Sequence, residues 1–142
     1  MNPLRTWILA SLRSAAWAPI FVLVLHIIAT RGFNAYHKLP WLDLPFHFFG
    51  GVAIAYFLWR SITIEAAKPV LGELSRVGQT IFTLAAVGAT TILWEFAEWT
   101  TDHFGWTGAQ RGLDDTMGDM LLGVIGGLTL LLLIAAVQRN RD

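Results

Sequence analysis

The chain has 142 residues, of which 55% are hydrophobic and 14% are charged, and it contains seven Trp and nine Phe. This composition is too apolar for a soluble domain of this size and predicts an integral membrane protein. A formal net charge of zero argues against a nucleic-acid-binding surface, and the lack of cysteine excludes disulfides and thiolate metal ligands.

Four apolar runs approach or reach the length of about 20 helical residues that crosses about 30 Å of hydrocarbon. They lie near residues 15–30, 41–59, 78–101 and 115–137. The first run is short, and residues 6–12 either extend it or form an interfacial turn. A cleavable signal peptide is the alternative for this segment, but the run lacks a small-residue cleavage pattern and Arg13 lies late for a leader. We therefore predict one membrane domain over residues 1–142, an all-α four-helix bundle.

Basic residues predict the orientation of these helices. Seven Lys and Arg residues lie in the N-terminus, the second loop and the C-terminus, against three in the first and third loops. The seven are Arg5, Arg13, Arg60, Lys68, Arg76, Arg139 and Arg141, and the three are Arg31, Lys38 and Arg111. Because basic residues favour the cytoplasmic side, both termini are expected in the cytoplasm.

Acidic residues follow the opposite distribution. Seven of the ten lie at ends of the second, third and fourth segments that should share the exoplasmic side: Asp43, Glu95, Glu98, Asp102, Asp114, Asp115 and Asp119. Carboxylates at membrane depth are costly and usually mark a functional site.

Six of the polar residues form pairs with helical spacing. Asp43 and His47 are separated by four residues, Glu95 and Glu98 by three, and Asp115 and Asp119 by four. These separations place both members of each pair on one helix face. All three pairs fall within about 10 Å of one depth at 1.5 Å per residue.

Small residues continue each polar face toward the middle of its helix. They are Gly51 and Ala55 on the second segment, Thr91, Gly88 and Ala85 on the third, and Gly123 and Gly127 on the fourth. Membrane helices present small residues where their backbones approach closely. The acidic faces are therefore expected to meet, with the acids inside the bundle.

Helix capping is the alternative reading for two of the acids. Asp43 precedes Pro45 at a helix start, an ordinary capping arrangement, and Asp114 reads more readily as a cap with Asp115 in the first turn. Asp119 lies more than one turn inside its helix, so capping does not account for it.

Glu95 and Glu98 lie near a helix C-terminus, where the helix macrodipole disfavours negative charge. A functional reading is favoured for these two glutamates and for Asp119.

The histidines, Asp102 and the tryptophans are expected to differ in role. The spacing from Asp43 favours a ligand role for His47, whereas His26 is expected to pack. Asp102 and His103 are expected in a solvated loop. Trp41, Trp94, Trp99 and Trp106 are typical of an interfacial belt.

Five carboxylates and one imidazole cannot all stay charged at close range unless a positive charge joins them. The alternatives are a bound cation, shared protons, or water access without a specific ligand. As a metal site the set comprises Asp43, His47, Glu95, Glu98, Asp115 and Asp119. Such an oxygen-rich set favours Mg²⁺, Mn²⁺ or Ca²⁺, with Fe²⁺ or Zn²⁺ as further candidates. The ligand count suits one or two ions, as in di-metal four-helix proteins.

Three motifs resemble a known family. The stretch from Asp43 to Gly50, the Trp94–Trp99 segment, and the stretch from Asp114 to Gly123 resemble, in that order, the YjdF-like bacterial inner-membrane proteins. The likeness spans residues 41–127. A looser similarity exists to VanZ-like membrane proteins, whose arginine-led motif has its nearest counterpart here in Arg111. The resemblance implies a multi-pass protein of the bacterial inner membrane and implies no particular reaction.

The leading hypothesis is a divalent-metal site near the exoplasmic face that acts on a lipid or lipid-linked envelope substrate. If the protein is an enzyme, it is expected to be a metal-dependent hydrolase or transferase in which Glu95, Asp119 and Arg111 take part, with Arg111 neutralising the acids or holding a substrate anion.

Two alternatives come from other classes of protein. One is an accessory subunit of a larger membrane complex or a homo-oligomer. The other is a cation or proton pathway, against which the apolar character of the helices below Gly51, Thr91 and Gly123 argues.

Overall fold

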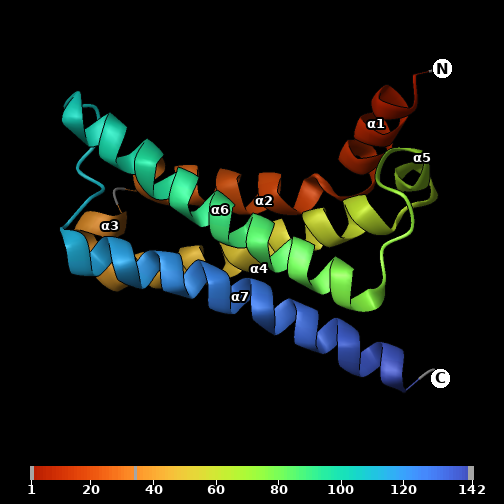
Figure 1. Cartoon of the computed structure of the whole chain (residues 1–142). Helices are drawn as coiled ribbons and strands as arrows, with labels where there is room; N and C mark the ends of the chain where they lie inside the picture. The colour runs from red at the N-terminus through yellow and green to blue at the C-terminus, as the bar shows by residue number, and fades with distance from the viewer. Residues whose placement is uncertain (1, 34, 141–142) are drawn as a thin grey trace.

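The computed structural model describes residues 2–33 and 35–140, whose regular elements are all helices, with no strand among these residues (Figure 1). The all-α prediction is confirmed. The main helices are α1 (Pro3–Ala15), α2 (Trp17–Ile27), α4 (Asp43–Thr63), α6 (Arg76–His103) and α7 (Leu113–Arg139). Short elements join them: a π-helical turn (Ile28–Gly32), α3 (Ala35–Lys38), 3-10 turns (Pro40–Leu42 and Glu65–Ala67), and α5 (Lys68–Leu71).

The N-terminal segment forms two helices where the sequence predicted one span with a possible extension. Asn2 caps α1 by accepting a hydrogen bond from Leu4 N at 2.9 Å. The chain then bends by 56° between α1 and the helical stretch from Trp17 to Gly32. Pro19 gives the reason, because its nitrogen cannot donate to the carbonyl four residues earlier and is tolerated only in a first helical turn. Trp7 Nε1 donates to Ser61 O at 2.7 Å and holds α1 against the end of α4.

Helix α4 is the centre of the packing and contacts α1, α2, α6 and α7. Its contact with α7 is made through backbones. A Cβ at Gly51 would overlap the carbonyl of Gly123, and a Cβ at Gly126 would overlap the carbonyl of Phe48. The small-residue faces of α4 and α7 therefore meet, as the sequence predicted. On α6, Thr91 adjoins Gly123, but a Cβ at Gly88 would meet no described atom within 4 Å and Ala85 is exposed, so the prediction for that helix holds only in part.

The two ends of the molecule differ in what they contain. The first turn of α1 and the last turn of α7 lie at one end, together with α5 (Figure 1). The opposite end holds α3, the first turns of α4 and α7, and the last turns of α6. The chain enters α7 through Gly112, whose φ of 126° favours glycine.

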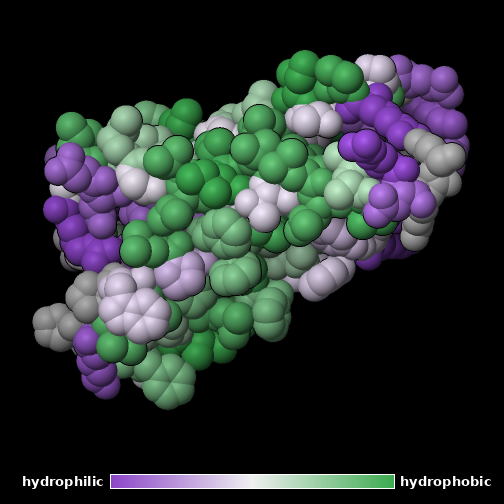
Figure 2. Space-filling view, turned by 90° about the horizontal axis from the view of Figure 1, so that it is seen from below, coloured by the Kyte–Doolittle hydropathy of each residue, from purple (hydrophilic) through white to green (hydrophobic). Residues whose placement is uncertain are grey.

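By length and composition, α6 and α7 can each cross a membrane. Helix α1 and the stretch from Trp17 to Gly32 add a third candidate if the two together count as one bent span. Helix α4 has 21 residues, but the mean hydropathy of its most apolar stretch is lower than in α6 and α7, because that stretch contains polar residues such as His47 and Arg60. The sequence predicted four spans, and length and hydropathy support two or three. Figure 2 shows a hydrophobic band between hydrophilic groups at two ends, the distribution expected of a membrane protein.

Candidate metal centre

Three helix ends bring the predicted acids together. The first turns of α4 supply Asp43 and His47, the last turns of α6 supply Glu95 and Glu98, and α7 supplies Asp119. Asp43, Glu95 and Asp119 retain only 3%, 5% and 2% of their accessible surface. Burial of carboxylates to this extent is rare unless they are paired or coordinate a cation.

His47 lies at the centre of the cluster. Its Nε2 is 3.3 Å from Asp43 Oδ1 and 3.7 Å from Asp119 Oδ2, and its Nδ1 is 3.8 Å from Glu95 Oε1. The imidazole therefore meets carboxylates from all three helices. Sequence spacing predicted the Asp43 contact, and the packing of α4 against α6 and α7 supplies the other two.

Two sets of ligand atoms are compact enough to surround a cation, and both include His47. Asp43, His47 and Asp119 form one set, and His47, Glu95 and Glu98 form the other, with the atoms of each set within 4.8 Å of one another. Asp119 Oδ1 and Glu95 Oε1 are buried and accept no hydrogen bond from the described residues. Such oxygens are costly to bury and are available as ligands.

Trp94 holds one of the predicted ligands in place. Its Nε1 donates to Glu98 Oε1 at 2.8 Å, and its ring makes an edge contact with His26 at a centroid distance of 5.5 Å. The sequence placed Trp94 in an interfacial belt and missed this contact. The available signal was the spacing of four residues between Trp94 and Glu98. His26 also contacts the ring of Phe46 at 5.5 Å, which agrees with the packing role predicted for it.

Arg111 pairs with two of the acids. Its Nη2 contacts Asp43 Oδ2 and lies 3.3 Å from Asp115 Oδ1, and its Nε donates to Asp115 Oδ2 at 3.3 Å. Asp115 therefore faces the guanidinium and belongs to neither compact set around His47. Partial burial lowers the pKa of Arg111, but the carboxylates of Asp115 and Asp43 raise it to a net value above the ordinary one. Of the two predicted roles of Arg111, the structure displays neutralisation of acids.

Neither of the aspartates considered as caps makes a capping hydrogen bond in the described chain. Helix α4 has Leu42 at its N-cap, and α7 has Gly112 there. Asp43 is instead buried against His47 and Arg111, whereas Asp114 is exposed in the first turn of α7. The capping interpretation of Asp114 is therefore wrong. An acid in this turn is still favoured by the helix macrodipole.

Asp102 was expected to be solvated in a loop, but it lies in the last turn of α6 and organises that loop. Its carboxylate accepts hydrogen bonds from the Thr107 hydroxyl, from Ala109 N at 3.0 Å and from Gln110 N at 2.9 Å. These bonds fold residues 104–110 back onto α6, and Arg111 follows directly. His103 is also helical and stacks on Trp99. Loop-to-helix bonds of this kind carry no periodic sequence signal.

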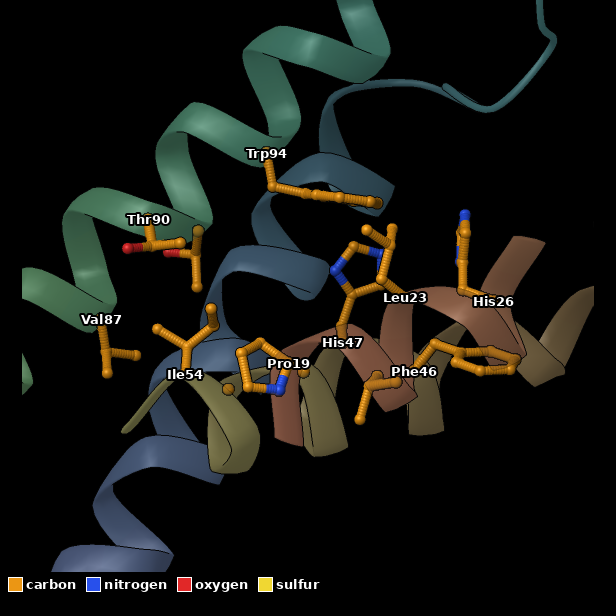
Figure 3. Close-up of a pocket in the computed structure, with 13 residues that line it drawn as sticks. Pro19, Leu23, His26, Phe46, His47, Ile54, Val87, Thr90 and Trp94 are labelled. Carbon is orange, nitrogen blue, oxygen red and sulfur yellow. The ribbon is translucent and has the colours of Figure 1, made fainter. Parts of the chain in front are cut away.

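An apolar pocket of about 190 Å³ adjoins the cluster between α2, α4 and α6. Figure 3 shows His47 and Trp94 at one part of this pocket and Ile54 and Val87 at another. Thr90 and Thr91 line it, but their hydroxyls donate to Ala86 O and Gly88 O of their own helix, both at 2.8 Å. The pocket therefore presents mainly carbon atoms, with His47 shared between it and the acids.

Fold and cluster together define a helical membrane protein with a buried group of carboxylates around one histidine. Residues 6–140 match the model of the family described as "Predicted membrane protein (DUF2238)", and the chain belongs to this family. It is 31% identical over 118 residues to an uncharacterized protein of Thermotoga maritima, covering 82% of this chain and 59% of that relative. The chain thus spans little more than half the length of this curated relative. No solved structure matches it.

Proposed function

We propose that this protein holds a divalent cation in the cluster around His47. The observation that carries the proposal is the pair of buried oxygens, Asp119 Oδ1 and Glu95 Oε1, which accept no hydrogen bond from the described residues and belong to residues of the two compact ligand sets. A cation coordinated by either carboxylate would satisfy its buried oxygen and offset the repulsion among the acids.

The ligand chemistry narrows the identity and number of ions. Carboxylate oxygens dominate, which favours Mg²⁺, Mn²⁺ or Ca²⁺, with Fe²⁺ or Zn²⁺ as alternatives that the imidazole suits. A neutral imidazole has one nitrogen with a free lone pair, so His47 serves one cation at a time. A second ion would be held by carboxylates alone, and Asp115 would join as a ligand only by leaving Arg111.

The membrane arrangement belongs to the same proposal. In it, α2, α4, α6 and α7 cross a bacterial inner membrane as a four-helix bundle with both termini in the cytoplasm and the cluster near the exoplasmic face. Support comes from the excess of basic residues in the terminal segments and from the common end at which α1 begins and α7 finishes.

The reaction that this site suits is metal-assisted hydrolysis or phosphoryl transfer, with a lipid or lipid-linked envelope molecule as the substrate. A bound cation would polarise the phosphoryl group or activate water. Glu95 and Asp119 are the acids nearest His47 on α6 and α7, and Arg111 would steady an anionic group by exchanging it for Asp43.

Elemental analysis of the purified protein in detergent tests the metal site. The wild type is compared, after dialysis against Mg²⁺, Mn²⁺, Ca²⁺, Fe²⁺ and Zn²⁺ in turn, with an Asp119→Asn, Glu95→Gln double variant and with Asp114→Asn, an exposed acid on the same helix as Asp119. We expect near-stoichiometric metal in the wild type and Asp114→Asn, and loss in the folded double variant. Equal metal in all three proteins, or none in any, would refute the proposal and favour the accessory-subunit alternative.

A further inference from the structure

The apolar pocket beside the cluster suits the apolar part of a ligand. It lies between α2, α4 and α6, beside the acids contributed by α4, α6 and α7. No Asp, Glu, Lys or Arg of the described chain is among its lining residues. Its threonine hydroxyls are bonded to their own helix, so the walls offer an occupant mostly methyl groups and aromatic rings.

The imidazole and indole rings gather at one part of the pocket. His47, His26 and the indole of Trp94 lie near one another in Figure 3, away from Ile54 and Val87. His47 is also the residue around which both ligand sets are built. An occupant that fills the pocket therefore has hydrocarbon against Ile54 and Val87 and a polar group at the level of His47.

On α4, the pocket has room for an added side chain at Gly50. A Cβ at Gly50 would meet no described atom within 4 Å, although a Cβ at the adjacent Gly51 would overlap α7. Gly50 lines the pocket, so a larger side chain at this position would enter the pocket without disturbing the helix contact.

We propose that the pocket takes one hydrocarbon chain of a glycerophospholipid whose phosphate lies beside His47, an assignment that rests on the proposed function because an anionic phosphate would be repelled by the acids without a cation. Arg111 does not line the pocket, but its pairing with Asp43 and Asp115 lowers the negative charge that the phosphate would meet. The substrate class of the metal centre is thereby a phospholipid that enters from the bilayer, with its chain between α2 and α6.

Lipid binding to delipidated protein in detergent tests this placement, with native mass spectrometry as the readout. The probes are dioleoyl-phosphatidylglycerol and dioleoylglycerol, which carries the same chains without phosphate, each with Mn²⁺ or with a chelator. Gly50→Leu fills the pocket. Gly88→Leu is the matched control, because a Cβ at Gly88 also meets no described atom within 4 Å and Gly88 does not line the pocket.

We expect phosphatidylglycerol to bind more tightly with Mn²⁺ than with chelator, and dioleoylglycerol to show no such dependence. Gly50→Leu should weaken phosphatidylglycerol binding about tenfold or more, since several buried methylene groups lose their place, while Gly88→Leu binds as the wild type does. Unchanged binding in Gly50→Leu, or equal loss in Gly88→Leu, would overturn the pocket assignment. If the protein takes up metal but phosphatidylglycerol binds equally well with Mn²⁺ and with chelator, the phosphate assignment would be overturned.

Metal content separates this inference from the proposed function. Gly50→Leu should keep the wild-type metal stoichiometry, because no ligand atom is changed. If the wild type holds no metal, the proposed function and the phosphate assignment fail together. If metal is present and lipid binding is insensitive to Gly50→Leu, the lipid inference alone fails.

Discussion

The α4–α7 interface has two neighbouring levels that differ in what lies between the helices. The glycine level is formed by Gly51 and Gly123, and the polar level by His47 and Asp119. At the level of Gly51 and Gly123 the backbones touch and no side chain separates them. One turn away, about 6 Å along the axis at 1.5 Å per residue, His47 and Asp119 face each other with Nε2 and Oδ2 3.7 Å apart. The glycine level therefore sets the helix spacing that lets buried polar side chains meet at the next level.

The two levels also differ in what stabilises them. The glycine level is held by van der Waals contact between backbones, which needs no further partner. At the polar level Asp119 and Glu95 lie more than one turn inside α7 and α6, beyond the reach of the helix macrodipoles, so the helix ends do not offset their charge. These buried carboxylates therefore need a partner of opposite charge or a proton.

The largest effect on stability is expected from adding a side chain at the glycine level. Gly51→Ala should destabilise the protein by about 1–3 kcal/mol or more, because the new methyl overlaps the carbonyl of Gly123 and forces α4 and α7 apart. Thermal unfolding followed by circular dichroism in detergent measures this. Gly118→Ala is the control, since a Cβ at Gly118 on α7 meets no described atom within 4 Å and should stabilise the helix slightly. Equal melting temperatures for the two variants would contradict the backbone-contact account.

A substitution at the polar level should lower metal affinity while the protein stays folded. Trp94→Phe removes the N–H that donates to Glu98 Oε1 while keeping an aromatic ring. Partners that orient a metal ligand typically contribute ten- to a hundredfold in affinity, so we expect a loss of about tenfold with little change in melting temperature. Metal titration followed by calorimetry measures the change. Trp99→Phe, at an exposed tryptophan stacked on His103, should leave affinity unaltered, and a similar loss there would argue against a specific Trp94 role.

Much of this organisation could be predicted because it follows helical periodicity. The spacings of Asp43 to His47, Glu95 to Glu98 and Asp119 to Gly123 identified one face of each helix, and those faces meet in the structure. A face is a local property of the sequence, and small residues mark where faces come together.

Features that depend on non-periodic contacts could not be predicted in the same way. Asp115 shares a face with Asp119, yet its carboxylate turns to Arg111 in the preceding loop. Asp102 binds backbone N–H groups up to eight residues away, through a loop shape that no spacing rule encodes. The separate helix α1 depends on Pro19 together with the bond from Trp7 to Ser61.

Arg111 connects the loop to the polar level and, in the proposed metal site, would compete with the cation for Asp43. Arg111→Gln removes this competition, so we expect metal affinity to rise a few-fold, in keeping with an ion pair that is partly exposed. Metal titration at low and high salt checks the sign, and the gain should shrink at high salt because screening weakens the pair. Arg31→Gln, at an exposed residue of the π-helical turn, is the charge-matched control. A fall in affinity specific to Arg111→Gln would mean that the guanidinium supports the site instead of competing with it.

The smallest effect is expected from Asp102, which acts on the polar level through Arg111. Asp102→Asn keeps the side-chain shape but weakens its acceptance of the Ala109 and Gln110 N–H groups, since bonds to a charged acceptor are the stronger ones. Amide hydrogen exchange should quicken across residues 104–112, while metal affinity shifts in the same direction as in Arg111→Gln and by less. Asp114→Asn, at an exposed acid without a capping bond in the described chain, should leave that exchange unaltered. Faster exchange without any shift in metal affinity would show that the loop folds independently of the polar level, and Arg111 would then be held by its partner carboxylates alone.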